Sequence, residues 1–159
     1  MKITVLCVGK IKESFMQDAV QEYEKRLSRY VKLRIIEVAD EKTPDNASGK
    51  EEIQIRDREG GRLLRHIKDE DYVIALAIDG KMYDSVSFSH KIDGFGVRGV
   101  SSLVFVIGGS LGLSLEVLSR ADEKISFSKM TFPHQLMRVI LLEQIYRCYR
   151  IIRGEPYHK

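Results

Sequence analysis

The last three residues of the chain carry groups that can bind and stack against a nucleic acid. Tyr157, His158 and Lys159 place a phenol, an imidazole and a cation side by side. RNA-binding sites use such groups, because aromatic rings stack on unpaired bases and cations contact phosphates. A chain terminus is also frayed by default, so this tail alone is equally compatible with an unstructured end.

A glycine-rich stretch, V-F-V-I-G-G-S-L-G-L, is the second candidate site. Gly108, Gly109 and Gly112 let the backbone approach a ligand closely and adopt positive φ, although a tight strand-to-helix turn would need the same residues. Neither G-x-G-x-x-G nor G-x-x-x-x-G-K-[ST] occurs in the chain. The loop therefore suits a neutral or cationic adenine-containing ligand better than a pyrophosphate.

The segment S-F-S-K-M-T-F-P-H, residues 126–134, is the third candidate. An ordinary strand-loop-helix junction with a hydrophobic staple would explain its proline. It would not explain why Phe127, Met130 and Phe132 are all apolar in a loop, whereas a hydrophobic wall for a flat ring or a thioether would. The sequence has no His, Cys, Asp or Glu set with metal-ligand spacing and no G-x-S-x-G motif, so we expect no metal and no covalent nucleophile.

The pattern of apolar residues predicts the elements that must position these segments. Strands are predicted near 3–8, 33–38, 72–78, 103–107 and 124–127, and helices near 12–30, 48–67, 88–95, 115–120 and 134–152. Strands that alternate with helices indicate an α/β fold with a mainly parallel sheet and helices on both faces. Ligands bind at the carboxyl ends of such strands, which points to residues 76–80, 108–112 and 126–133.

Two of the predicted helices carry more specific expectations. Ser48 is predicted to cap the second helix, whose apolar positions are Ile53, Leu63, Leu64 and Ile67. The last helix has twelve apolar residues among its nineteen, too many for a single stripe. Either this helix is central to the fold or its second face is a subunit interface, and we favour the interface because a terminal helix usually lies outside.

The charged residues of the last helix have simple structural explanations. Glu143 and Arg147 stand four residues apart in the favourable order, so a surface ion pair accounts for both. Arg138, Arg150 and Arg153 are equally compatible with solvated positions.

Length and composition exclude several classes of protein. The chain has 159 residues, of which 43% are hydrophobic and two are cysteines, which predicts a single domain over 1–159. No apolar run approaches the ~18 residues of a membrane span, and the apolar start is too short for a signal peptide. Cys7 and Cys148 are too few for a disulfide framework. We therefore expect a cytoplasmic protein without membrane association.

The positive charge is concentrated at one end of the chain. The net charge of +3 is too small to indicate a nucleic-acid partner. Residues 120–159, however, hold eight Lys and Arg against four Asp and Glu, whereas residues 1–119 hold 18 against 19. The last helix and the tail are thus predicted to form a local basic patch that includes Arg147, Arg150 and Lys159.

Several motifs in fixed order resemble the RlmH family. They are V-F-V-I-G-G-S-L-G-L, S-F-S-K-M-T-F-P-H-Q-L-M-R-V, E-Q-I-Y-R and the C-terminal P-Y-H-K. The opening M-K-I-T-V-L-C-V-G-K and the length also fit, so the resemblance covers essentially the whole chain. These proteins are SPOUT-class methyltransferases that use S-adenosylmethionine to methylate N3 of a pseudouridine in 23S rRNA, as 23S rRNA (pseudouridine-1915-N3)-methyltransferases.

The resemblance implies a fold, an assembly and a set of site residues. The fold is a SPOUT-type α/β knot with a C-terminal trefoil knot, and the assembly is a homodimer in which the partner's tail completes the active site. The implied cofactor contacts are Leu76, Gly108, Phe127, Ser128, Lys129, Met130, Thr131 and Phe132. The implied RNA-binding residues are His134, Arg150 and Lys159, and the implied catalytic residues are Arg147, Tyr157 and His158.

The implied chemistry needs no metal, because methyl transfer from a sulfonium is an in-line displacement. N3 must lose its proton at or before attack, so our hypothesis is that His158 accepts the proton, Arg147 stabilises the developing charge and Tyr157 positions the uracil ring. Two alternatives remain. One is a non-catalytic ribosome- or RNA-binding protein with a vestigial cofactor pocket, and the other is a small α/β enzyme acting on a nucleotide.

Overall fold

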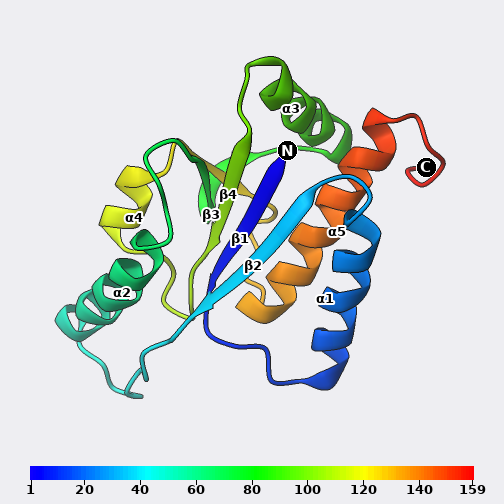
Figure 1. Cartoon of the computed structure of the whole chain (residues 1–159). Helices are drawn as coiled ribbons and strands as arrows, with labels where there is room; N and C mark the ends of the chain where they lie inside the picture. Colours follow the sequence, from blue (N-terminus) through cyan, green and yellow to red (C-terminus); the bar gives the residue numbers. More distant parts are fainter.

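All strands of the protein pair in parallel within one sheet. The computed structural model describes residues 1–159 and is shown in Figure 1. The strands are β1 (Lys2–Val8), β2 (Lys32–Val38), β3 (Tyr72–Met82), β4 (Ser102–Ile107) and β5 (Glu123–Ser126). Their order across the sheet is β2-β1-β4-β3-β5. The predicted parallel α/β fold is therefore confirmed.

The helices cover both faces of the sheet, also as predicted. One face carries α1 (Ser14–Leu27), α3 (Ser85–Val97) and α5 (His134–Ile152), and the other carries α2 (Gly49–Leu64) and α4 (Leu115–Arg120) (Figure 1). No helix is long and apolar enough to span a membrane.

The central strands β1 and β4 send alternate side chains to two separate cores. Ile3, Val5 and Cys7 of β1 join the core under α1, α3 and α5, whereas Leu6 and Val8 join the core under α2 and α4. This alternation follows from the two-residue period of a strand, and burial on both faces explains why the two strands are almost wholly apolar.

The two cysteines lie in the same core and form no disulfide. Cys7 of β1 and Cys148 of α5 are both fully buried. Burial raises the pKa of each thiol to about 12. Both side chains are therefore protonated at neutral pH and act as small apolar groups.

The last helix lies in the middle of its layer rather than at its outer side. α5 packs between α1 and α3, and its Leu141, Leu142, Ile145 and Cys148 are fully buried (Figure 1). Packing against two helices and the sheet accounts for much of the excess of apolar residues. The structure thus supports the central position that the sequence left as the less favoured alternative.

The helix α2 begins as predicted, and the predicted apolar positions Leu63, Leu64 and Ile67 pack in the core under α2 and α4. Ser48 forms a capping box with Glu51, since each side chain accepts a hydrogen bond from the other residue's backbone. The prediction that Ile53 is a core position is wrong, because its side chain is 52% exposed. Ile55 is buried in place of Ile53, and a Cβ on the buried Gly60 would lie 2.3 Å from Ser114 Oγ beside α4. At Gly60 the helices α2 and α4 therefore approach closely, without a large apolar side chain between them.

Candidate functional site

Three loops at the carboxyl edge of the sheet enclose a cavity of about 520 Å³. The loops come from the end of β3 (76–78), from the glycine-rich stretch after β4 (107–112) and from the segment between β5 and α5 (125–134). The predicted convergence of the three unusual strand ends is therefore confirmed. The residues proposed for cofactor contact all line this cavity except Lys129, which is exposed outside it.

A bulge in β3 shapes one wall of the cavity. Leu76 and Lys81 both pair with Ile125 of β5, so residues 77–80 bulge out of the ladder. A Cβ on Gly80 would lie 2.6 Å from the carbonyl carbon of Ile125, so only glycine permits this close crossing of the two strands. The prediction that the strand ends near Ile78 is wrong, because β3 resumes its pairing beyond the bulge and continues to Met82.

The glycine-rich loop folds back on itself at the cavity. Gly112 has a φ of +82° and its N–H donates to the Gly109 carbonyl at 3.0 Å. A Cβ on Gly108 would lie 2.7 Å from the carbonyl carbon of Gly112. The glycines therefore form a tight turn, and the same turn presents backbone rather than side chains to the cavity.

The segment 126–133 forms the apolar wall expected from the sequence. The Ser128 hydroxyl accepts a hydrogen bond from the Met130 N–H at 2.9 Å, which fixes the loop locally. Phe127 packs edge-on against Phe88 of α3, with ring centres 6.0 Å apart. Met130, 75% exposed, and Phe132 lie at the rim of the cavity.

The cavity lining is electrically almost neutral. It contains no Lys, Arg, Asp or Glu, and its single titratable side chain is His134 at the start of α5. Burial and the nearby positive charge of Arg138 lower the pKa of His134, which favours the neutral imidazole. A neutral lining neither repels a cationic ligand nor attracts a phosphate.

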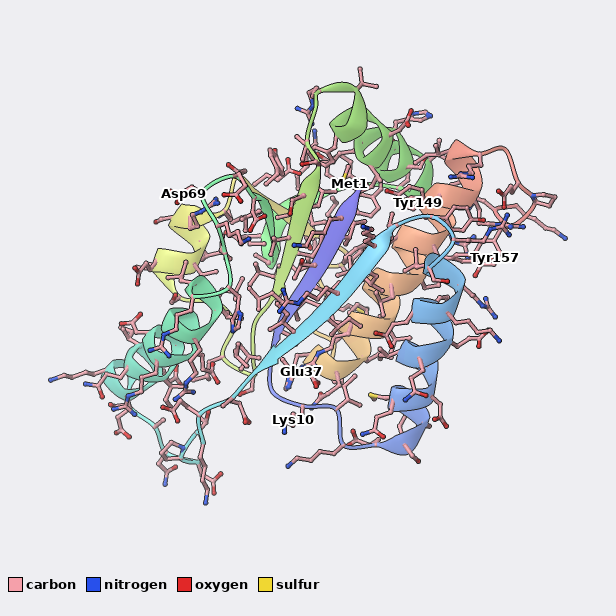
Figure 2. The ribbon with its side chains drawn as sticks, in the orientation of Figure 1. Met1, Lys10, Glu37, Asp69, Tyr149 and Tyr157 are labelled. Atoms are coloured by element: carbon pink, nitrogen blue, oxygen red, sulfur yellow. The ribbon has the colours of Figure 1, made fainter.

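A buried arginine fixes the start of α5 against the sheet. Arg138 is only 1% exposed, so a solvated position is wrong for this residue. Its guanidinium donates to Glu37 Oε2 at 2.7 Å and to the backbone carbonyls of Val8 and Gly9 at 2.8 and 2.7 Å. Figure 2 shows Glu37 near the end of β2, beside the first turns of α5. Arg138 thus joins three elements next to the cavity.

The three predicted catalytic residues lie together at the other end of α5. Arg147 pairs with Glu143 at 2.6 Å, as the spacing predicted, and its guanidinium lies 4.6 Å from the centre of the Tyr157 ring. The Tyr157 hydroxyl donates to Glu143 Oε1 at 3.1 Å, and Arg147 Nη1 lies 3.2 Å from His158 Nδ1. The tail is therefore ordered against the helix rather than frayed.

The contact between Arg147 and His158 fixes the tautomer of the imidazole. A guanidinium can only donate, so Nδ1 accepts and the proton of the neutral ring lies on Nε2. In this arrangement Nε2 of His158 carries the N–H donor, and the lone pair of Nδ1 accepts the hydrogen bond from Arg147.

Within one chain the tail and the cavity do not meet. His158 lines a second cavity of about 620 Å³, on the side of Tyr83 and Gln144. Phe127 and Phe132 border both cavities, so the segment 126–133 separates them. Lys159 is exposed and forms no ion pair.

Arg150, expected to contact RNA, is engaged within its own chain. Its guanidinium pairs with Glu155 and donates to the Pro156 carbonyl at 2.7 Å, and Tyr30 is a further partner. Sequence reasoning missed Tyr30 and Glu155 because they lie 125 residues apart and neither belongs to a recognisable motif.

Comparisons with known proteins give matches over essentially the whole chain. The family model described as "Predicted SPOUT methyltransferase" matches residues 1–158. Proteins named "Ribosomal RNA large subunit methyltransferase H" from Clostridium tetani and Clostridium novyi are 63% and 61% identical, over the full length of both chains.

A solved structure supports the fold. It is described as "a probable methylase family protein from Haemophilus influenzae Rd KW20", with a TM-score of 0.56 at 10% identity. The match covers 99% of this chain and 70% of that one.

Proposed function

Because the chain belongs to the SPOUT methyltransferase family, we propose that it methylates ribosomal RNA of the large subunit, at N3 of a pseudouridine in 23S rRNA. The observation that carries this proposal is the full-length identity of 63% to a protein named as a ribosomal RNA large subunit methyltransferase. The whole of 1–159 acts as one methyltransferase domain in this proposal, and the site of action is the cytoplasm, where ribosomes work.

The cavity at the carboxyl edge fits S-adenosylmethionine. The lining carries no cation that would repel the sulfonium, and the glycine-rich turn offers backbone groups to an adenine. Phe127 and Met130 supply apolar surface for a flat ring or a thioether. We therefore assign cofactor binding to this cavity, with Leu76, Gly108 and residues 127–132 as its contacts and Lys129 at its outer margin.

Gly108→Ala is expected to weaken S-adenosylmethionine binding by at least about tenfold, or ~1.4 kcal/mol. The new Cβ would lie 2.7 Å from the Gly112 carbonyl carbon, so the turn must open and its backbone groups leave their positions. Isothermal titration calorimetry measures the affinity. Gly96→Ala in α3, where a Cβ meets nothing within 4 Å, is the matched control. Equal affinities of the two variants would contradict the assignment.

The reaction requires proximity and the removal of one proton. S-adenosylmethionine, when bound, supplies a methyl group on a sulfonium that is open to in-line attack. The substrate N3–H must pass its proton to a base, so that the N3 lone pair can form the new bond while the S–C electron pair returns to sulfur. Positioning alone supplies several kcal/mol of the acceleration.

His158 and Arg147 perform this proton transfer together in our proposal. The Nδ1 lone pair of His158 is occupied while Arg147 donates to it. Arg147 must therefore turn from Nδ1 to a uracil oxygen, where it stabilises the developing negative charge. That movement frees Nδ1 to accept the N3 proton, and Tyr157 holds the ring.

The separation of tail and cavity supports a homodimer. Within one chain Phe127 and Phe132 stand between His158 and the cofactor cavity, whereas a partner's tail could reach the cavity from outside. Exposed apolar side chains at the rim, Ile78, Met130 and Phe132, offer surface for that contact. We also propose that the C-terminal part of the fold forms a trefoil knot. His134 and Lys159 are the proposed RNA contacts, and the ribosome is the proposed partner.

The decisive experiment is transfer of labelled methyl groups. The protein and labelled S-adenosylmethionine are incubated with assembled ribosomes, free subunits and naked rRNA, and the labelled nucleotide is mapped. Label at N3 of a pseudouridine in 23S rRNA is expected. Incorporation into none of the three would overturn the enzyme function, and salt-dependent RNA binding without cofactor binding would favour the non-catalytic alternative.

A further inference from the structure

The C-terminal turn is tied to the rest of the protein through one carboxylate. Glu155 Oε2 accepts a hydrogen bond from the Tyr30 hydroxyl at 2.6 Å and pairs with Arg150, while Arg29 lies 3.7 Å from Oε1. The Glu155 N–H also donates to the Arg150 carbonyl at 2.8 Å. We call the set Tyr30, Arg150 and Glu155 the Glu155 latch.

The latch joins three parts of the chain that are distant in sequence. Tyr30 lies in the turn between α1 and β2, Arg150 in the last turns of α5, and Glu155 in the tail. Arg150 contributes twice, because its Nη2 donates to the Pro156 carbonyl at 2.7 Å. Both ends of the guanidinium are thus used inside the chain, which leaves Arg150 poorly placed to bind a phosphate.

The latch rests on a rigid aromatic support. The Tyr30 ring stacks on Tyr149, with centres 5.7 Å apart and planes 18° from parallel. Tyr146 lies edge-on to Tyr30 at 6.1 Å and to Tyr157 at 4.9 Å, so it links the latch to the tail. The hydrogen bond from Tyr30 and the positive charges of Arg150 and Arg29 lower the pKa of Glu155, which keeps the carboxylate charged.

The position of the latch fixes the residues that follow it. Gly154, with a φ of +63°, ends α5 and turns the chain back, and Pro156 restricts the backbone after the latch. Tyr157 and His158 follow in the chain, and their side chains contact Glu143 and Arg147 respectively. Without the contacts of Glu155 to Tyr30 and Arg29, nothing before Tyr157 would hold the five terminal residues to the turn between α1 and β2.

We propose that the Glu155 latch positions Tyr157 and His158 for methyl transfer, so that Glu155, Tyr30 and Arg150 are positioning residues of the reaction. The inference rests on the proposed function. It assigns Arg150 a role inside the protein in place of the phosphate contact expected from the sequence.

Glu155→Gln in the full-length protein tests the latch. The variant keeps the size of the side chain and every positive charge, but it loses the ion pair. We expect kcat for methylation of unmethylated ribosomes to fall by about tenfold to a hundredfold, because small misplacements of reacting groups have effects of that order. The ribosome KM, the cofactor affinity and the Tm should stay close to wild type.

Two further measurements separate positioning from other roles. Tyr30→Phe should cause a smaller loss, and the double variant should be no slower than Glu155→Gln alone, because both substitutions break one link. In the free protein, the backbone ¹⁵N relaxation of Tyr157 and His158 should show increased mobility in Glu155→Gln. Asp69→Asn, an exposed acid far from Tyr157 (Figure 2), is the matched control and should behave as wild type.

The outcomes distinguish this inference from the proposed function. An active wild-type protein with an equally active Glu155→Gln variant would overturn the latch and leave the function intact. A change in RNA affinity and in its salt dependence, at unchanged kcat, would overturn the latch in favour of Arg150 as a phosphate contact. An inactive wild-type protein would overturn the proposed function, and the catalytic role of the latch with it.

Discussion

Replacing Arg147 by alanine is expected to lower kcat for rRNA methylation by about a hundredfold to a thousandfold. The guanidinium contacts Glu143, the Tyr157 ring and His158 Nδ1 at once, so its loss removes both the charge and the contacts that hold the tail. Cofactor affinity should be unchanged, because Arg147 does not line the cofactor cavity. Steady-state methylation kinetics and calorimetry measure the two quantities separately.

A conservative substitution of Arg147 and a substitution of a distant arginine test whether the guanidinium of Arg147 itself is required. Arg147→Lys should recover only part of the rate, since an ammonium keeps the charge but loses the planar fork. Arg65→Ala, an exposed arginine at the end of α2, is the control and should leave kcat unchanged. A kcat for Arg147→Ala close to that of the control would remove Arg147 from the catalytic machinery.

His158→Ala tests the proton-acceptor half of the same proposal. If His158 takes the N3 proton, the variant should lose rate and should no longer show the wild-type dependence of kcat on pH. A variant that methylates ribosomes at the wild-type rate across pH would leave Arg147 as an electrostatic group and exclude His158 as the base.

Replacing Arg138 by methionine is expected to destabilise the protein by about 3–5 kcal/mol. The substitution leaves the Val8 and Gly9 carbonyls without the arginine donor at a fully buried site, and it leaves the Glu37 carboxylate with only the Ile11 N–H as a donor. A loss of that size lowers the Tm of a domain of this length by roughly 6–20 °C. Urea unfolding should show a lower midpoint at an unchanged slope.

The partner of Arg138 should matter less. Glu37 is 34% exposed and keeps part of its hydration, so Glu37→Gln is expected to cost only about 1 kcal/mol. Arg65→Met serves as the exposed control and should change stability by less than about 0.5 kcal/mol. A similarly small loss for Arg138→Met would show that the loop from β1 relaxes to satisfy its carbonyls with water.

The sequence predicted the elements where short-range signals are strong. Pro133 and Gly154 frame α5, which spans His134–Ile152 as predicted, and Ser48 caps α2. The convergence of the cavity loops was also predictable, because parallel strands bring their carboxyl ends to one edge. Ile53 was misassigned, because the buried face of α2 runs through Ile55, Gly60 and Leu63, and Gly60 lets α4 approach closely.

The long-range polar contacts were not predictable. Arg138 and Glu37 are 101 residues apart in the sequence, and Tyr30 and Glu155 are 125 apart. Neither pair therefore produces a periodic or local pattern in the sequence. Arg138 and Arg150 of α5 looked solvated for the same reason, since an isolated arginine in a helix is usually on the surface. The motifs located the site, whereas the contacts that hold it in shape required the fold.

Because both native cysteines are buried, a cysteine introduced into the tail can be labelled selectively. Cys7 and Cys148 are fully buried, with thiol pKa values raised to about 12, so maleimide reagents find almost no thiolate at neutral pH. A single Lys159→Cys substitution at the exposed terminus would therefore carry the only reactive thiol in the folded chain. A spin label or fluorophore attached there would report the distance between the two tails of the proposed homodimer, with no native cysteine to remove first.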